Sequence, residues 1–128
     1  MPSFLILDDS PGKMEFLRRI VLRAKWPGEI LTAVTTEEAC ALIDAHAEIG
    51  ASFIDYYIPD ENGPSVIRYL LQKNPSAKIA LVSSADSEEN GAEARRAGAT
   101  AVVCTSGLMD FVERRLLELL EEWQMNNE

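Results

Sequence analysis

Three aspartates stand where two mainly apolar segments of the chain end. Asp8 and Asp9 follow residues 4–7, and Asp55 follows residues 51–54. A carboxylate at the end of a buried strand costs free energy unless a cation or hydrogen-bond donors meet it. Three such carboxylates in one place would suit Mg²⁺, which prefers oxygen ligands and usually takes only one or two protein carboxylates. The sequence therefore indicates a metal-dependent site, provided that the fold brings the two segment ends together.

A bound Mg²⁺ would also favour one kind of reaction. By neutralising charge, the ion lets a carboxylate attack an electrophilic phosphorus atom, and the product is a covalent aspartyl-phosphate. Asp9 and Asp55 would bind the ion directly, and Asp8 would act through water or by orienting its neighbours. Ser84, at the end of a later strand, would donate a hydrogen bond to a phosphoryl oxygen. The alternative for Asp8 or Asp9 taken singly is a turn or a helix cap.

The elements that must position these residues alternate along the chain. Strands are predicted at residues 3–8, 29–33, 51–55, 78–83 and 100–104, and helices at residues 10–25, 35–47, 64–73, 87–98 and 107–124. Thr35 and Glu38 have capping-box spacing. Asp86 or Ser87 is expected to cap the fourth helix, and Gly98 to end it.

Alternation of strands and helices predicts the fold. Five strands and five helices indicate an α/β protein, with a parallel sheet covered on both faces. A flavodoxin-like, doubly wound strand order of 2-1-3-4-5 places the functional crevice between strands one and three, at whose carboxyl ends all three aspartates lie. We expect a single domain over residues 1–128. One apolar face is predicted on the last helix, formed by Leu108, Phe111, Val112, Leu116, Leu119, Leu120 and Trp123.

Composition narrows the classes of partner. The formal net charge of -9 disfavours nucleic acid and anionic membranes, because both require basic patches. No apolar run approaches the roughly 20 residues of a membrane span. Cys40 and Cys104 are expected to be buried thiols in a reducing compartment rather than a disulfide or a metal pair. We therefore expect a cytoplasmic protein.

Four segments of the chain carry a family resemblance. LILDDS, FIDYYIPDENG, LVSSA and AGATAVV resemble, in order, the signatures of the receiver domain of bacterial response regulators, and together they cover essentially the whole chain. The resemblance implies that Asp55 accepts a phosphoryl group and that Ser84 is the family's hydroxyl residue. It also implies that Asp9, Asp55 and the backbone carbonyl of Tyr57 bind Mg²⁺, with Asp8 as their acidic neighbour.

Three positions on or beside the last strand depart from the family pattern. Thr105 stands where the family has a lysine that contacts the phosphoryl group, Ser106 where it has a proline, and Val102 where it has an aromatic switch residue. Losing one partner of a buried charge contact typically costs about 2–5 kcal/mol. The bond between Thr105 and Ser106 is expected to be trans, because a cis bond before a residue other than proline costs roughly 2.5–4 kcal/mol.

A lysine elsewhere offers a substitute for the lost cation. Lys13 lies four residues after Asp9, on the first turn of the first helix, and its flexible stem could carry the ammonium toward the site. The alternative is a solvated lysine on an exposed helix face.

The leading interpretation is a phosphorelay receiver and not an enzyme. It would take a phosphoryl group on Asp55 from a histidine kinase or phosphotransfer protein. Its output would be a downstream protein that docks on the face formed by the fourth helix, the fifth strand and the fifth helix. The runner-up is a degenerate receiver, a phosphorylation-independent interaction module, which Thr105 and Val102 favour.

Two other classes fit less well. A haloacid-dehalogenase-type phosphatase needs a second acid two residues after its nucleophile, where this chain has Ser10 or Pro11. A flavodoxin needs a phosphate-binding loop after the first strand, and the acidic stretch at residues 8–12 would repel a phosphate that lacks a metal.

Overall fold

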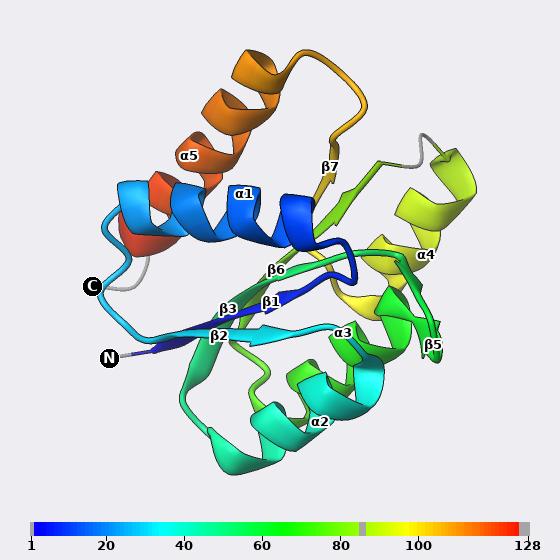
Figure 1. Ribbon diagram of the computed structural model, residues 1–128. Coiled ribbons are helices and arrows are strands. Elements are labelled where there is room, and N and C mark those ends of the chain that lie inside the picture. Colours follow the sequence, from blue (N-terminus) through cyan, green and yellow to red (C-terminus); the bar gives the residue numbers. More distant parts are fainter. Residues whose placement is uncertain (1, 85–86, 126–128) are drawn as a thin grey trace.

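A five-stranded parallel sheet forms the centre of the protein. The computed structural model describes residues 2–84 and 87–125 (Figure 1). Its strands run in the order β2-β1-β3-β6-β7, which is the predicted 2-1-3-4-5 order. Their bounds are Ser3–Leu7 for β1, Ile30–Ala33 for β2, Ile49–Ile54 for β3, Lys78–Ser83 for β6 and Ala101–Cys104 for β7.

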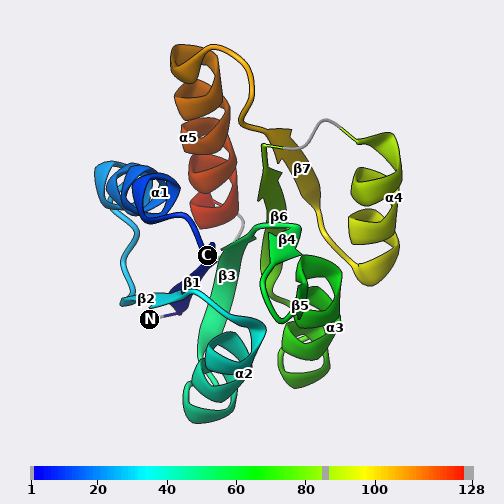
Figure 2. The ribbon, with the colours of Figure 1, turned by 45° about the vertical axis from the view of Figure 1, so that its right-hand side comes forward.

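Five helices cover the two faces of this sheet. They are α1 (Pro11–Arg23), α2 (Thr36–Ala45), α3 (Gly63–Lys73), α4 (Glu88–Ala97) and α5 (Met109–Met125). Helices α1 and α5 pack together on one face, while α2, α3 and α4 line the other (Figures 1 and 2). The predicted α/β fold is therefore confirmed. Among the described residues, no helix has the length and apolar composition needed to span a membrane.

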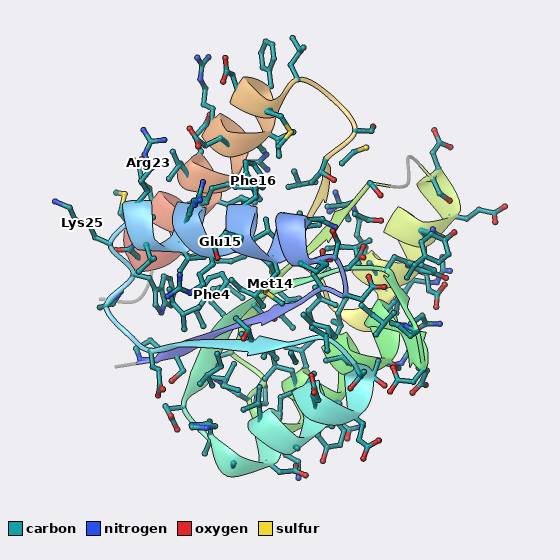
Figure 3. All side chains as sticks on the ribbon, viewed as in Figure 1. Phe4, Met14, Glu15, Phe16, Arg23 and Lys25 are labelled. Atoms are coloured by element: carbon teal, nitrogen blue, oxygen red, sulfur yellow. The ribbon has the colours of Figure 1, made fainter. Side chains whose placement is uncertain are left out.

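Each strand supplies side chains to two separate cores because successive residues point to opposite faces. Phe4 packs under α1 and α5, where its ring meets Phe53 edge-on at 4.8 Å and Trp26 at 5.2 Å. Its neighbour Leu5 belongs to the core beneath α2, α3 and α4. At the far end of α1, Arg23 pairs with Glu113 of α5 at 2.6 Å, while Lys25 points away from the body of the protein (Figure 3). The sheet is thus buried on both faces, which holds its strand ends in fixed positions.

Local capping explains where three of the helices begin. The Ser10 side chain caps α1 by accepting the Lys13 backbone N–H. Thr35 caps α2 by accepting the Glu38 N–H at 3.1 Å, as its capping-box spacing predicts. Ser87 caps α4.

The end of α4 agrees with the sequence prediction, whereas the segment after β3 differs from it. Gly98 ends α4 with φ 117°, a conformation that glycine adopts without steric cost. Asp86, the other cap candidate for α4, lies outside the described residues. A two-stranded hairpin, β4 (Tyr57–Ile58) with β5 (Glu61–Asn62), occupies the segment that was predicted to be a plain loop.

The first turn of α5 corrects a sequence prediction. Leu108 precedes the helix and is 71% exposed, and Phe111 is 66% exposed, although both were assigned to the single apolar face of this helix. The buried stripe begins only at Val112. The start of α5 (orange) rises beyond the end of β7, so no strand lies beneath it to cover these side chains (Figure 1). Helical periodicity cannot reveal where the neighbouring sheet ends.

Both cysteines are free thiols as predicted, but each is only partly buried, whereas the sequence predicted buried thiols. Cys40 is partly buried on α2, and Cys104 lies at the end of β7. Burial raises the pKa of the Cys40 thiol, and the negative charge of Asp44 adds to the rise. Because only the thiolate is a good nucleophile, Cys40 is expected to be unreactive at neutral pH.

Candidate functional site

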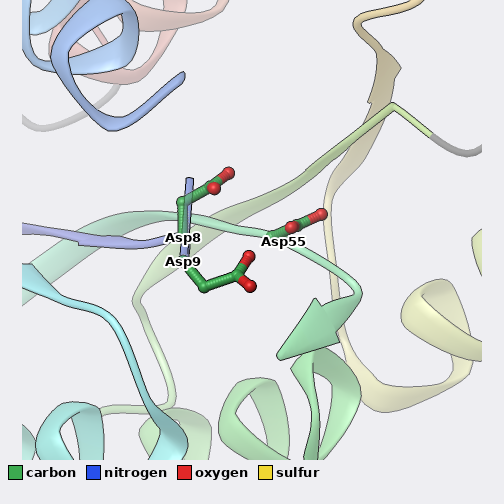
Figure 4. A group of neighbouring side chains, drawn as sticks. All are labelled: Asp8, Asp9 and Asp55. Carbon is green, nitrogen blue, oxygen red and sulfur yellow. The ribbon is translucent and has the colours of Figure 1, made fainter. Parts of the chain in front are cut away.

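The three aspartates converge at the carboxyl ends of two neighbouring strands. Strands β1 and β3 pair in parallel with Leu7 opposite Ile54, so the residues that follow them meet at one edge of the sheet. One carboxylate oxygen each from Asp8, Asp9 and Asp55 lies within 4.8 Å of the other two. Figure 4 shows the three side chains gathered at these strand ends. The predicted convergence is confirmed.

Asp8 is the buried member of the group. Its side chain is fully buried, and its Oδ1 accepts the backbone N–H of Ser10 at 2.9 Å. Its Oδ2 has no hydrogen-bond donor among the described residues; the Lys13 ammonium lies 2.8 Å away but outside hydrogen-bond geometry. Asp8 therefore combines the turn-making role that was weighed as an alternative with an oxygen directed at a cation.

Lys13 reaches into the site from the first turn of α1. Its ammonium lies 2.8 Å from Asp8 Oδ2 and 3.3 Å from Asp55 Oδ1. It also donates a hydrogen bond of 2.6 Å to the carbonyl of Val82 in β6. The side chain is only 14% exposed, so the solvated-lysine interpretation is wrong.

Asp55 is held in a state that disfavours its charge. Burial raises its pKa, the Lys13 ammonium opposes this rise, and the neighbouring charge of Asp8 adds to it. The backbone N–H of Tyr56 and the Lys13 ammonium both approach Oδ1, the former at 2.8 Å. Neither contact uses Oδ2, which leaves that oxygen for a metal or an incoming electrophile.

A glycine fixes the backbone beneath Asp55. A Cβ added to Gly63, the first residue of α3, would lie 2.1 Å from the carbonyl oxygen of Asp55 and 2.9 Å from a methyl group of Ile54. The Gly63 N–H donates to the Tyr56 carbonyl at 2.8 Å. Because any larger residue would push the Asp55 backbone away, the close approach requires glycine here.

Two tyrosines tie the segment after Asp55 to α4, a connection that the sequence did not predict. The Tyr56 hydroxyl donates to Glu93 at 2.7 Å, and the Asn90 amide donates to the Tyr57 hydroxyl at 3.1 Å. The two rings meet edge-on at 4.8 Å. The role of the Tyr57 carbonyl as a metal ligand stays a prediction.

Asp60 anchors the same loop to α2, and its role was also not predicted. Its carboxylate accepts the backbone N–H groups of Thr36 and Glu37 and the Thr36 hydroxyl. The pKa of Asp60 is lowered, chiefly by the hydrogen bond that its carboxylate accepts from the Thr36 N–H. A carboxylate at a helix N-terminus is well placed for such donors.

The remaining predicted residues lie at the ends of β6 and β7. Ser84 is exposed just after β6, so it shares the carboxyl edge of the sheet with the aspartates. The Thr105 N–H donates to the Ser83 carbonyl at 2.9 Å and so extends the β6–β7 ladder. No peptide bond among the described residues is cis, so the Thr105–Ser106 bond is trans, as predicted. Any part that Ser84 or Thr105 plays toward a phosphoryl group stays a prediction.

The donor set fits a divalent cation of the Mg²⁺ type. Carboxylate oxygens are the ligands that hard cations prefer, and here three carboxylates meet. The Oδ2 of Asp8 already pairs with a cation, the Lys13 ammonium at 2.8 Å, so Asp8 is left to orient its neighbours rather than to bind the ion. Asp9 and Asp55 would hold the ion, with Asp8 behind them.

Comparisons with known proteins agree with this geometry. The profile of the response regulator receiver domain matches residues 4–106. A CheY-like receiver domain protein from Methanospirillum hungatei is 22% identical, with a TM-score of 0.79 and coverage of 98% of both chains. A response regulator protein from Burkholderia pseudomallei, solved with a phosphorylated aspartic acid and a calcium ion, is 21% identical with a TM-score of 0.76, over 99% of this chain and 73% of that one.

A third solved structure extends the range of bound metals. The Mn²⁺-bound form of response regulator Rcp1 is 11% identical, with a TM-score of 0.81, over 96% of this chain and 94% of that one. At these identities the solved structures show the shared fold alone. No curated protein sequence matches the chain.

Proposed function

Because this chain belongs to the response regulator receiver domain family, we propose that it accepts a phosphoryl group on Asp55 from a histidine kinase or phosphotransfer protein. The observation that carries the proposal is the meeting of three carboxylates at the ends of β1 and β3, with Asp55 itself raised in pKa. Burial destabilises the charged form of a carboxylate, and forming a covalent bond or binding a cation removes that destabilisation.

The chemistry follows from the contacts of Asp55. Its Oδ2 attacks the phosphorus of a phosphohistidine; a new O–P bond forms, the P–N bond breaks, and the released imidazole nitrogen takes up a proton. A bound Mg²⁺ would draw negative charge from the phosphoryl oxygens during this transfer. Asp9 helps to hold that ion, and Asp8 keeps its neighbours oriented through its bond from Ser10. The Ser84 hydroxyl would donate to a phosphoryl oxygen.

This proposal makes the chain a phosphoprotein of two-component signalling and not an enzyme. Asp55 ends the transfer as an acyl phosphate, so the phosphoryl group stays on the protein itself and no separate substrate is converted and released. We also propose a cytoplasmic location, where the proposed donors, histidine kinases and their phosphotransfer proteins, would reach Asp55. The net charge of -9 argues against direct binding to nucleic acid.

The output is proposed to be a protein contact on the face of α4, β7 and α5. Leu108, Met109 and Phe111 form an exposed apolar patch at the start of α5. Beside it, one groove runs along β7 between Val102 and α4, and a second lies between β7 and α5. Exposed apolar patches on a protein surface are typical of protein interaction sites.

The second candidate is a degenerate receiver that binds partners without phosphorylation. Thr105 and Val102 favour it, because the strand that normally carries the lysine and the aromatic residue has neither. One experiment separates the two functions: incubation with acetyl phosphate and Mg²⁺, followed by intact mass measurement.

The expected result is a gain of one phosphoryl group by the native chain. Asp55→Asn removes the nucleophile with almost no change of shape, so it should gain none. A native chain whose mass stays unchanged under these conditions supports the degenerate module and contradicts the receiver.

A further inference from the structure

We propose that Lys13 is the phosphoryl-binding cation of this protein, presented by the first turn of α1 rather than by the end of β7. This inference rests on the proposed phosphorylation of Asp55. It goes beyond that proposal by assigning a role that residue Thr105, at the usual lysine position, cannot fill, because threonine carries no charge.

The position of the ammonium is the first argument. Lys13 comes from the α1 side, passes the carboxylates that follow β1 and β3, and ends on the Val82 carbonyl of β6. β6 pairs directly with β7, with Val82 opposite Val103. The positive charge therefore lies at the ends of three strands, one strand away from the backbone of Thr105. An aspartyl-phosphate on Asp55 would form within reach of this ammonium.

Its burial is the second argument. The basic residues further along α1 are largely solvated, Arg19 being 76% exposed and Arg23 64%. Lys25, beyond the end of the helix, also points into solvent (Figure 3). Lys13 is 14% exposed, although ordering a lysine side chain costs up to about 2 kcal/mol of rotamer entropy. Only specific contacts within the site explain why this one lysine is buried.

The helix dipole is the third argument. Lys13 lies in the first turn of α1, where the partial positive charge of the helix N-terminus disfavours a cation. Nothing local to the helix therefore favours a lysine here. Lys13 is stabilised by its ion pairs with Asp8 and Asp55. The acidic site, and not the helix, therefore accounts for a lysine at this position.

The contact with Asp55 is suited to transfer to a phosphoryl group. At 3.3 Å it is the longest of the three that the ammonium makes, so it is the first to be exchanged. Phosphorylation replaces one negative charge on Asp55 by roughly two. The ammonium can stay on Asp8 and Val82 while it turns its remaining N–H toward the new oxygens.

Equilibrium binding of beryllofluoride in the presence of Mg²⁺ tests the role, because this anion mimics a phosphoryl group on a carboxylate without any transfer reaction. Isothermal titration calorimetry compares the native chain with Lys13→Met, which keeps the stem and removes the charge. Lys25→Met is the matched control, since it removes the same charge from exposed chain. We expect Lys13→Met to bind beryllofluoride about tenfold more weakly or worse, and Lys25→Met to match the native chain.

A titration with Mg²⁺ alone separates phosphoryl contact from simple charge balance. Loss of an adjacent positive charge should leave Mg²⁺ affinity unchanged or increase it, so only beryllofluoride binding should weaken. Equal beryllofluoride binding by Lys13→Met and the native chain would overturn the proposal. An equal loss of affinity for Mg²⁺ alone would overturn it as well, because Lys13 would then only organise the metal ligands.

Thr105→Lys supplies a second test that does not depend on the stability of Lys13→Met. The double variant Lys13→Met/Thr105→Lys carries a lysine at the end of β7 in place of the one on α1. It should bind beryllofluoride within about threefold of Thr105→Lys alone, which corresponds to about 0.7 kcal/mol. A double variant that stays tenfold weaker would count against an exchangeable lysine. Absence of beryllofluoride binding in the native chain would overturn both this inference and the proposed phosphorylation of Asp55.

Discussion

Asp55 sits in surroundings that oppose its ionisation even though a lysine lies beside it. Burial comes first among the causes that raise its pKa, and Asp8 reinforces it. Such a group is costly to the folded state and useful to a phosphoacceptor, because the same destabilised charge is what a metal and a phosphoryl group relieve.

The raised pKa of Asp55 predicts that Asp55→Asn changes the stability of the fold in a pH-dependent way. The folded-state pKa lies above the ordinary value, so the folded chain holds the Asp55 proton more tightly than the unfolded chain does. Ionised Asp55 therefore lowers stability at neutral pH, and the penalty fades as pH falls through the raised pKa toward the ordinary value of about 3.9. Asp55→Asn should melt at a higher temperature than the native chain at pH 7 without metal. The gap should close with acid and with added Mg²⁺. Equal melting temperatures at pH 7 would contradict the assigned pKa direction.

For individual residues, the sequence predicted where the three aspartates lie better than it predicted which side chains contact the site. Asp8, Asp9 and Asp55 could be placed together because parallel strand ends share one edge of a sheet. The contacts of Lys13 could be offered only as one of two alternatives, since spacing fixes the helix turn of a residue and not the direction of a four-carbon stem. Glu93, which accepts the hydrogen bond of the Tyr56 hydroxyl, lies 37 residues away in the chain, so no local sequence pattern could predict this contact.

Helix α4 is connected to the segment after Asp55 by hydrogen bonds rather than by an aromatic residue on β7. Tyr56, which directly follows Asp55, donates to Glu93, and Tyr57 accepts from Asn90. The raised pKa of the Tyr56 hydroxyl, caused first by its bond to Glu93, agrees with this contact. We expect these bonds to link the position of the Asp55 backbone to that of the helix that borders the proposed output face.

Tyr56→Phe should therefore loosen α4 while leaving the site intact. The variant loses one partly buried hydrogen bond, a loss of about 1 kcal/mol, and keeps the ring contact with Tyr57. Amide hydrogen exchange should become faster over Glu88–Ala97 and stay unchanged over Pro11–Arg23, which serves as the internal control. Uniform acceleration in both helices would point to global destabilisation instead and would contradict a specific connection.

Elements were predicted well where local chemistry decides them. β6 has its predicted bounds, and Thr35 and Ser87 cap the helices that their positions indicated. The hairpin of β4 and β5 was missed because two-residue strands leave no periodic signal. The start of α5 was misjudged for a different reason: its apolar spacing is genuine, but exposure depends on how far the sheet extends.

On the scale of the whole molecule, the two hydrophobic cores stabilise the fold, and the three aspartates lie together at the carboxyl edge of the sheet. The sheet is buried on both faces and fixes the strand ends, while charge concentrates at the carboxyl edge. The apolar patch at the start of α5 lies outside both cores. An exposed apolar patch that adds nothing to folding fits the proposed contact with a partner, and its contribution to folding can be measured.

The double variant Leu108→Ser/Phe111→Ser should leave the free energy of unfolding within about 0.5 kcal/mol of the native value, because both side chains are solvated in the folded and the unfolded chain. Leu116→Ala, five residues after Phe111 on the same helix but fully buried, is the matched control and should cost about 2–5 kcal/mol. Urea unfolding followed by tryptophan fluorescence measures both changes, since Trp26 and Trp123 are buried in the same core as Leu116. A loss of several kcal/mol in the double variant would mean that the patch belongs to the folded core, and the proposed output face would then lose its apolar centre.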